Sequence, residues 1–365
     1  MRMRIAVVVS SVALVVGAGL AGSPAYGSPG SRTTVEHVGQ IARQDIAPQP
    51  GSEPDTLVEP DVAVSPRDPR IAVAVAHDGR FPDGGAVDIS YAWTHDGGRS
   101  WHHAPMPFLT KALGGTWDRV SDPVAAFGPD GTVYVSTLLF MVDSCPTAVG
   151  VSRSTDGGRT FGRPVLAHFS ASCAVSDDKN WLVVDTSPRS PHRGRLYQFW
   201  TPFLGDEAGN AFASPQVLRW SDDRGRHWSR TVNVSATDVF TQDSQPMIQP
   251  DGTITDAYLN FGADSGREGP EARETGAETE VQRPDAAAAP VGDLMAARTS
   301  HDGGATWSPE VTITHDAGEG PAGIRCCLPS ATADPRTGRL YATWDSASPD
   351  TVALSTSRDG RHWSA

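Results

Sequence analysis

The chain has 365 residues, of which 38% are hydrophobic and 7% aromatic, and its formal net charge at pH 7 is −13. This length and composition are typical of a globular protein with a large buried core, and they exclude a disordered chain. The negative charge disfavours binding to the phosphate backbone of nucleic acids or to anionic lipids.

The N-terminus has the pattern of an export signal. Arg2 and Arg4 precede an apolar run from Ile5 to Val16, and small residues that allow cleavage after Ala25 or Gly27 follow. A membrane anchor is the alternative, but the apolar run is short for a bilayer span. We therefore expect residues 1–27 to be a secretory signal peptide and the mature protein to be secreted, with no membrane association after cleavage.

A short sequence then recurs five times along the chain. The copies are "THDGGRSW" from Thr94, "STDGGRTF" from Ser154, "SDDRGRHW" from Ser221, "SHDGGATW" from Ser300 and a shortened "SRDGRHW" from Ser357. The aspartate can accept hydrogen bonds from backbone N–H groups that follow it, and glycine supplies a positive φ. The final aromatic residue can pack between neighbouring sheets. We interpret the repeated aspartates as structural turn residues; they are Asp96, Asp156, Asp223, Asp302 and Asp359.

A second pattern precedes each copy. Segments that begin at Glu59, Asp122, Asn180, Gln245 and Leu328 each read as a strand, a turn rich in Pro, Gly and Asp, and another strand. A third strand leads into the aspartate turn and a fourth leaves it. Each unit is thus predicted to be a four-stranded antiparallel meander, and radial repetition of such units forms a β-propeller.

Together the five copies resemble the Asp-box, or BNR-repeat, propellers of the sialidase (neuraminidase) superfamily. The family frame S-x-D-x-G-x-T-W is matched almost letter for letter from Ser300 to Trp307. The resemblance covers roughly Glu59 to the end, and it implies that residues 58–365 form an all-β, sialidase-like propeller. Sialidases of this type have six blades, whereas five are visible in the sequence.

Two explanations account for the missing blade. Residues 28–57 form an N-terminal extension, and its segment "VEHVGQIA" (Val35–Ala42) could supply an outer strand that closes a five-bladed ring. Alternatively, the chain lacks the sixth blade of a six-bladed parent, so that the propeller is incomplete at its C-terminus. We favour the second explanation, because a ring left open would expose long sheet edges that propellers protect.

Two further features concern the loops. The acidic segment 262–290, which is poor in apolar residues, is predicted to be a mobile insertion. Export also makes the four cysteines candidates for disulfides. We expect a bond between Cys145 and Cys173, with Cys326 and Cys327 either bonded to each other or free.

In a propeller the starts of the inner strands converge on one mouth of the central channel. The residues expected there are Glu59, Arg119, Asp122, Asp178, Lys179, Asp243, Gln245 and Arg325. Carboxylates and a few cations at a concave mouth suit proton transfer, binding of sugar hydroxyls or binding of a hard cation. No cofactor is expected to be required, although calcium could bind, and no Cys/His spacing indicates zinc.

The sialidase mechanism makes sharper demands. The family uses three arginines, a tyrosine nucleophile activated by a glutamate, and an aspartate as acid/base. Its Arg-Ile-Pro signature is missing, since the equivalent place reads "VEPDVAV", and Arg119 and Arg325 are the plausible mouth arginines. Tyrosines recur at matching points of the second strand in successive units, which marks them as packing residues; they are Tyr134, Tyr197, Tyr258 and Tyr341.

Two functions follow as hypotheses. The resemblance implies an exo-α-sialidase-like glycoside hydrolase that acts on terminal acidic sugars of glycans, and we expect the protein to be a monomer. Asp122 or Asp178 would be its acid/base and Arg119 and Arg325 would hold the sugar, while Lys179, Glu59, Asp243 and Gln245 would contact the substrate. The alternative is a non-catalytic propeller that binds a glycan or a protein at the same mouth.

Overall fold

The computed structural model describes residues 40–43, 46–206, 210–262, 294–315, 328–346 and 351–364. This part of the chain is all-β, apart from one short 3-10 helix, η1 (Lys111–Leu113). In the same ranges, no helix has the length and apolar character needed to cross a membrane. The predicted signal peptide and almost all of the acidic insertion lie outside the described residues, as do Arg325, Cys326 and Cys327.

The strands form successive antiparallel meanders, as predicted. The first contains β1 (Leu57–Val64), β2 (Ala72–Arg80), β3 (Ala86–Thr94) and β4 (His102–Pro105), and the second contains β5 (Arg119–Phe127), β6 (Val133–Phe140), β7 (Thr147–Ser154) and β8 (Val165–Ser170). The third contains β9 (Val175–Val184), β10 (Leu196–Gly205), β12 (Val217–Ser221) and β13 (Val232–Asn233), with the short β11 (Ala211–Ala213) beside β10. The fourth contains β14 (Phe240–Ile248), β15 (Ile254–Gly262), β16 (Leu294–Ser300) and β17 (Val311–Thr314). The fifth contains β18 (Ser330–Ala333), β19 (Leu340–Asp345) and β20 (Val352–Ser357).

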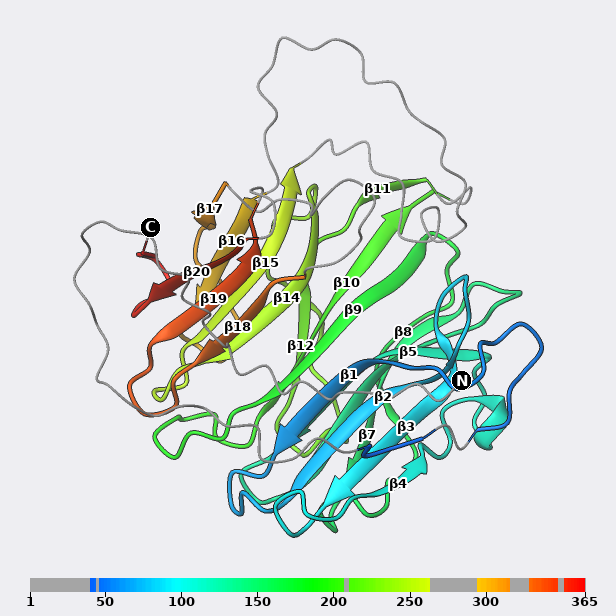
Figure 1. Ribbon diagram of the computed structural model, residues 1–365. Coiled ribbons are helices and arrows are strands. Elements are labelled where there is room, and N and C mark those ends of the chain that lie inside the picture. Colours follow the sequence, from blue (N-terminus) through cyan, green and yellow to red (C-terminus); the bar gives the residue numbers. More distant parts are fainter. Residues whose placement is uncertain are drawn as a thin grey trace, which may run out of the picture.

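The meanders follow one another in space as they do in sequence. The first two lie on the right of Figure 1, β9 and β10 lie in the middle, and the fourth and fifth lie on the left. The first strands of neighbouring meanders are in contact, in the order β1, β5, β9, β14 and β18. This arrangement is propeller-like. The number of blades in a closed ring stays a prediction.

The repeated aspartates follow the third strand of each meander, and in the first four meanders they close the turn to the fourth strand. Asp302 accepts hydrogen bonds from the Ser300 hydroxyl at 2.8 Å, the Thr306 N–H at 2.9 Å and the Thr306 hydroxyl at 2.6 Å. Asp156 makes the corresponding bonds with Ser154 and Thr160. Although burial works in the opposite direction, these bonds lower the pKa of Asp156 to about 2. The geometry is that of a structural turn with an ionised aspartate.

The aspartate turns also pack against the neighbouring meander. Phe161, which ends the turn of the second meander, packs edge-on against Tyr91 of the first, with ring centroids 4.9 Å apart. Trp307 of the fourth meander approaches Phe199 of the third in the same way, at 6.0 Å. Gly158 has a φ of +88°, and a Cβ atom there would lie 2.3 Å from Cγ2 of Val73 in the first meander. The turn therefore needs glycine both for its backbone and for close approach to the next sheet.

We expect Gly158→Ala to lower the free energy of unfolding by about 2–4 kcal/mol, because it combines an unfavourable backbone conformation with overpacking against a stiff valine. Gly162→Ala in the same connection is the matched control, since its added Cβ would have only the Arg153 carbonyl oxygen nearby, at 3.8 Å. Urea unfolding of both variants measures the difference. Equal stability of the two variants would contradict this account of the turn.

Several carboxyl groups are buried inside the sheets. Burial raises the pKa of Asp88, Asp177 and Asp256 to about 7 in each case. Asp88 accepts a bond from the Thr110 hydroxyl at 2.5 Å, and Asp256 accepts one from the Ser244 hydroxyl at 2.6 Å. At neutral pH the folded protein therefore holds protons that the unfolded chain has released.

This difference predicts how stability depends on pH. A raised carboxyl pKa contributes stability that is present below the unfolded value of about 4 and is lost as the pH rises through about 7, by up to about 1.4 kcal/mol per pH unit and group. The turn aspartates act in the opposite sense, and their contribution is lost in acid. Urea unfolding should therefore give greater stability at pH 5 than at pH 8, with a shallower decline for Asp256→Asn. A profile that is flat or rises from pH 5 to pH 8 would count against the buried acids.

Candidate functional site

The first strand of each of the first four meanders contains a β-bulge. In each bulge a charged residue adopts a positive φ: Glu59 (51°), Asp122 (48°), Lys179 (46°) and Asp243 (66°). Residues other than glycine rarely adopt this conformation, and it costs on the order of 1–3 kcal/mol. Strained bulges tend to occur where a side chain must be aimed at a functional site. Their repetition at corresponding places marks the centre of the molecule as the candidate site.

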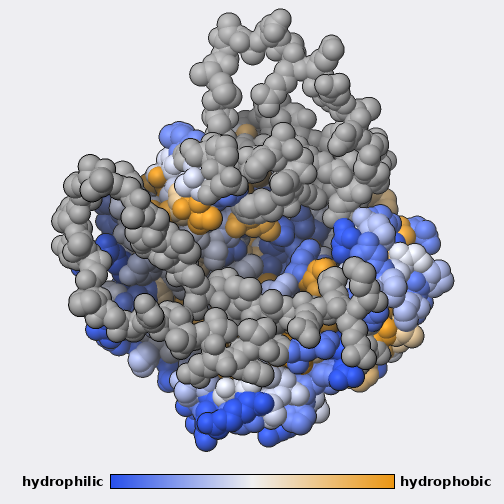
Figure 2. Space-filling model, in the orientation of Figure 1, coloured by the Kyte–Doolittle hydropathy of each residue, from blue (hydrophilic) through white to orange (hydrophobic). Residues whose placement is uncertain are grey.

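Side chains from four meanders meet there. Asp178, next to the bulge residue of β9, accepts a hydrogen bond from Nε2 of Gln242 in β14 at 2.6 Å. The charges of Asp122 and Asp243 act on Asp178, and the charge of Glu59 acts on Lys179. We call Glu59, Asp122, Asp178, Lys179 and Asp243 the central cluster. Figure 2 shows that the molecule is hollowed near the centre of the face in view, where many of the visible residues are hydrophilic.

Asp178 is the member best placed to hold a proton. Burial, followed by the negative charge of Asp122, raises its pKa, while the ammonium group of Lys179 opposes the rise. Asp178 and Lys179 both keep part of their surface open to solvent. A carboxyl group that is densely surrounded and still accessible can donate a proton to a bound substrate.

Asp122 is held differently. Its Oδ1 accepts a hydrogen bond from the Ser121 hydroxyl at 2.6 Å, and its Oδ2 is buried without a hydrogen-bond partner. Its backbone N–H donates to Nε2 of the buried His77 at 2.9 Å, which fixes the bulge from the second strand of the neighbouring meander. The two aspartates are thus held by different partners, Asp178 by Gln242 and Asp122 by Ser121.

One group in the described chain has the spacing of a metal site. Donor atoms of Glu59, His77 and Asp122 lie within 4.8 Å of one another. However, Nε2 of His77 already accepts the Asp122 N–H, so its lone pair is engaged. The two carboxylates could hold a hard cation such as calcium without the histidine.

The other predicted mouth residues are placed as follows. Arg119 forms a two-pronged ion pair with Asp83, donates to the Gly84 carbonyl at 2.8 Å and lies over the Phe81 ring. Gln245 is buried in β14 opposite Ala257, and the amide that contacts Asp178 belongs to Gln242 instead. The structure therefore brings together the acidic residues and Lys179, while Arg119 is engaged elsewhere.

His77 and Gln242 were not predicted. His77 stands within an apolar second strand, where a lone histidine usually marks packing, and Gln242 directly precedes a predicted residue. The tyrosines lie where packing residues would: Tyr134, Tyr197 and Tyr258 are buried in second strands. Tyr258 is fully buried and donates to Oε2 of Glu310 at 2.6 Å.

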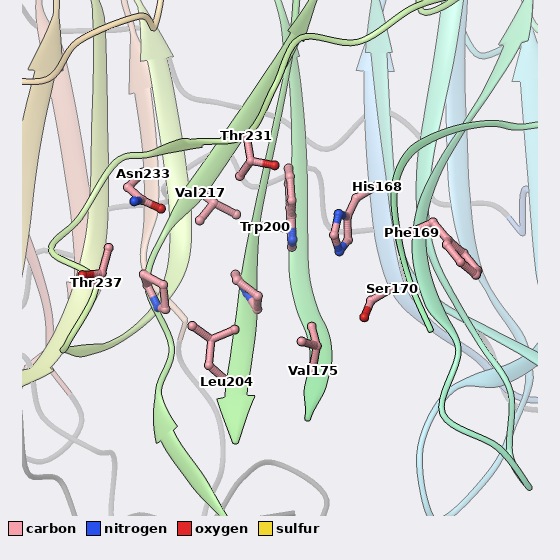
Figure 3. A pocket seen from close by; sticks show the side chains of 12 residues that line it. His168, Phe169, Ser170, Val175, Trp200, Leu204, Val217, Thr231, Asn233 and Thr237 are labelled. Atoms are coloured by element: carbon pink, nitrogen blue, oxygen red, sulfur yellow. The ribbon is translucent and has the colours of Figure 1, made fainter. Parts of the chain in front are cut away.

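A separate cavity of about 310 Å³ lies between the second and third meanders. Figure 3 shows His168 and Trp200 face to face at this place, with their ring centroids 4.9 Å apart, and Leu204 and Val217 among the other lining residues. The lining is mostly apolar, and no member of the central cluster belongs to it. We therefore place the candidate site at the central cluster, where strained and charged residues converge.

Comparison with known proteins agrees with this fold. No protein-family model and no curated protein matches the chain. Among solved structures, an α-L-arabinanase of Penicillium chrysogenum in complex with arabinobiose is 14% identical, with a TM-score of 0.54 over 86% of this chain and 81% of that one. An α-L-arabinofuranosidase of Fusarium graminearum with an iminosugar inhibitor is 15% identical, with a TM-score of 0.55 over 88% and 84%. The intramolecular trans-sialidase of Ruminococcus gnavus with oseltamivir carboxylate is 13% identical, with a TM-score of 0.53 over 89% and 85%.

At these identities the likeness establishes the fold. The chain has the all-β architecture of propeller-like glycoside hydrolases, among which both arabinan-directed and sialic-acid-directed enzymes occur.

Proposed function

We propose that the protein is a secreted glycoside hydrolase whose reaction takes place at the central cluster. The observation that carries the proposal is the convergence of strained, charged bulge residues on Asp178, a partly accessible carboxyl group with a raised pKa. Glycoside hydrolysis needs two carboxyl groups in different protonation states, one to protonate the leaving group and one to act on the anomeric carbon. Asp178 and Asp122 are our candidates for these two roles.

In this mechanism Asp178 donates its proton to the glycosidic oxygen as the bond from that oxygen to the anomeric carbon breaks. Asp122 either takes a proton from the water molecule that attacks the anomeric carbon, or attacks that carbon itself before water releases the sugar. The Ser121 hydroxyl and the His77 contact hold Asp122 in place. The leaving group departs as an alcohol, and the proton from water restores Asp178 or remains on Asp122.

A sialidase acting on terminal acidic sugars is the more specific version of this proposal. The repeated aspartate turns and the likeness to a trans-sialidase fold favour it. The engagement of Arg119 with Asp83 weighs against it, because a sialidase holds the sugar carboxylate with free arginines. A non-catalytic glycan-binding module is the alternative from another class of function.

A panel of fluorogenic glycosides tests the proposal. It should include an α-sialoside, an α-L-arabinofuranoside and the common hexosides, and be assayed with the secreted protein at pH 5–7, with and without calcium. Turnover of any member that is lost in Asp178→Asn supports a hydrolase. Binding of glycans without turnover across the panel and across natural polysaccharides would identify a binding module instead.

A further inference from the structure

Lys179 occupies an unusual position at the centre of the molecule. It is the bulge residue of β9, with a φ of 46°, and in the described part of the chain its ammonium group forms no ion pair or hydrogen bond with a protein side chain. Although burial works against its charge, the neighbouring carboxylates, chiefly those of Asp122 and Asp243, raise its pKa, so it stays protonated at neutral pH. Three N–H donors are thus held at the mouth, with several acceptors around them.

This arrangement of donors and acceptors matches neighbouring hydroxyl groups. A hydroxyl group both donates and accepts, so one can accept from Lys179 while it, or its neighbour, donates to Asp122 or Asp243. An anionic sugar meets a different environment. Its carboxylate would gain one ammonium partner but would stand among the carboxylates of Glu59, Asp122 and Asp243, and like charges in such a site repel strongly.

No arginine among the described residues that were predicted at the mouth is free to offset this repulsion. A sugar carboxylate is best recognised by the paired N–H groups of arginine. Arg119 already uses these groups for Asp83 and the Gly84 carbonyl, and only 12% of its side chain is exposed.

We propose that the central cluster binds an uncharged sugar residue: Lys179 donates hydrogen bonds to the hydroxyl groups of the sugar, and the carboxylates of Glu59, Asp122 and Asp243 exclude an anionic one. The inference rests on the proposed function for the location of the site. The inference concerns the charge of the bound sugar, whereas the proposed function concerns catalysis. Binding can therefore be tested separately from turnover.

The test compares matched sugars that differ only in a carboxylate: methyl galactoside with methyl galacturonide, and methyl glucoside with methyl glucuronide. Methyl arabinofuranoside and N-acetylneuraminic acid are added. Affinities are measured by calorimetry and saturation-transfer NMR on the wild-type protein, Lys179→Met, Lys179→Arg and the exposed control Lys111→Met. We expect at least one uncharged sugar to bind the wild type ten-fold or more tightly than its acidic counterpart. Lys179→Met should lose this binding ten-fold or more, while Lys111→Met keeps it.

Tighter binding of the acidic sugars, unchanged binding by Lys179→Met, or no binding of any sugar would overturn the inference. The wild-type comparison does not depend on whether a variant folds, and thermal unfolding of Lys179→Met and Lys179→Arg checks the variants themselves. Binding of an uncharged sugar without turnover of any glycoside would leave the inference intact and remove the proposed function. Turnover of a sialoside would support the proposed function and overturn the inference, because the substrate would be anionic.

Discussion

Replacing Asp178 with asparagine is expected to lower the turnover of a glycoside substrate by about 10²- to 10⁴-fold, the range typical of a general acid. Asparagine keeps the shape of the side chain and can still contact Gln242, but it has no proton to give to the leaving group. The measurement is kcat on whichever glycoside the panel identifies. Asp238→Asn, which removes a charge from the exposed loop between β13 and β14, is the control and should leave kcat unchanged.

The pH profile distinguishes an acid from a merely structural residue. Burial and the Asp122 charge raise the pKa of Asp178, so the active, protonated form persists toward neutral pH and the rate falls as the pH rises through that pKa. The falling limb should disappear from the residual activity of Asp178→Asn. Full activity in this variant, or an unchanged falling limb, would remove Asp178 from the mechanism.

Removing the Cys145–Cys173 disulfide should lower the free energy of unfolding by roughly 3–4 kcal/mol, since the bond closes a loop with a sequence separation of 28 residues. The bond joins the connection between β6 and β7 to the connection that leads into β9, as the sequence predicted. Because β9 carries Asp178 and Lys179, loss of the disulfide should also make the central cluster less ordered. Urea unfolding of the double variant Cys145→Ser, Cys173→Ser measures the effect.

Two comparisons check the origin of this loss. Reduction of the wild-type protein should reproduce it, because Cys173 is exposed and the bond can be reached by a reductant. Ser144→Ala, next to the bond, should have no comparable effect. A double variant as stable as the oxidised wild type would mean that the bond contributes nothing to the fold.

The meander organisation could be predicted from the sequence because each unit carries its own local signals. The Ser or Thr, the Asp and the Gly of a turn interact within five residues, as in the bonds between Ser300, Asp302 and Gly304. Local hydrogen bonds of this kind leave a fixed spacing in the sequence. The antiparallel strands on either side follow from the same spacing.

The candidate site could be predicted only in part. Asp122, Asp178 and Lys179 lie near the starts of the first strands of their meanders, and in a propeller these starts converge on one mouth of the channel. The capture of Arg119 by Asp83 depends on a contact between residues 36 positions apart, and no local pattern reveals it. Gln245 was predicted, whereas Gln242 makes the contact; a bulge shifts the register between the two and so changes the face on which a strand residue lies.

The bulges in the first strands of the meanders carry the charged residues of the site, whereas the aspartate turns stabilise the fold. In β1, β5, β9 and β14 the bulge residue has a positive φ, and these residues are a glutamate, two aspartates and a lysine. Exchanging one of these side chains alters the charge of the centre but leaves the sheets and their aspartate turns untouched. Single substitutions can therefore change substrate preference while the turns maintain the scaffold, so that proteins with one fold can act on quite different sugars.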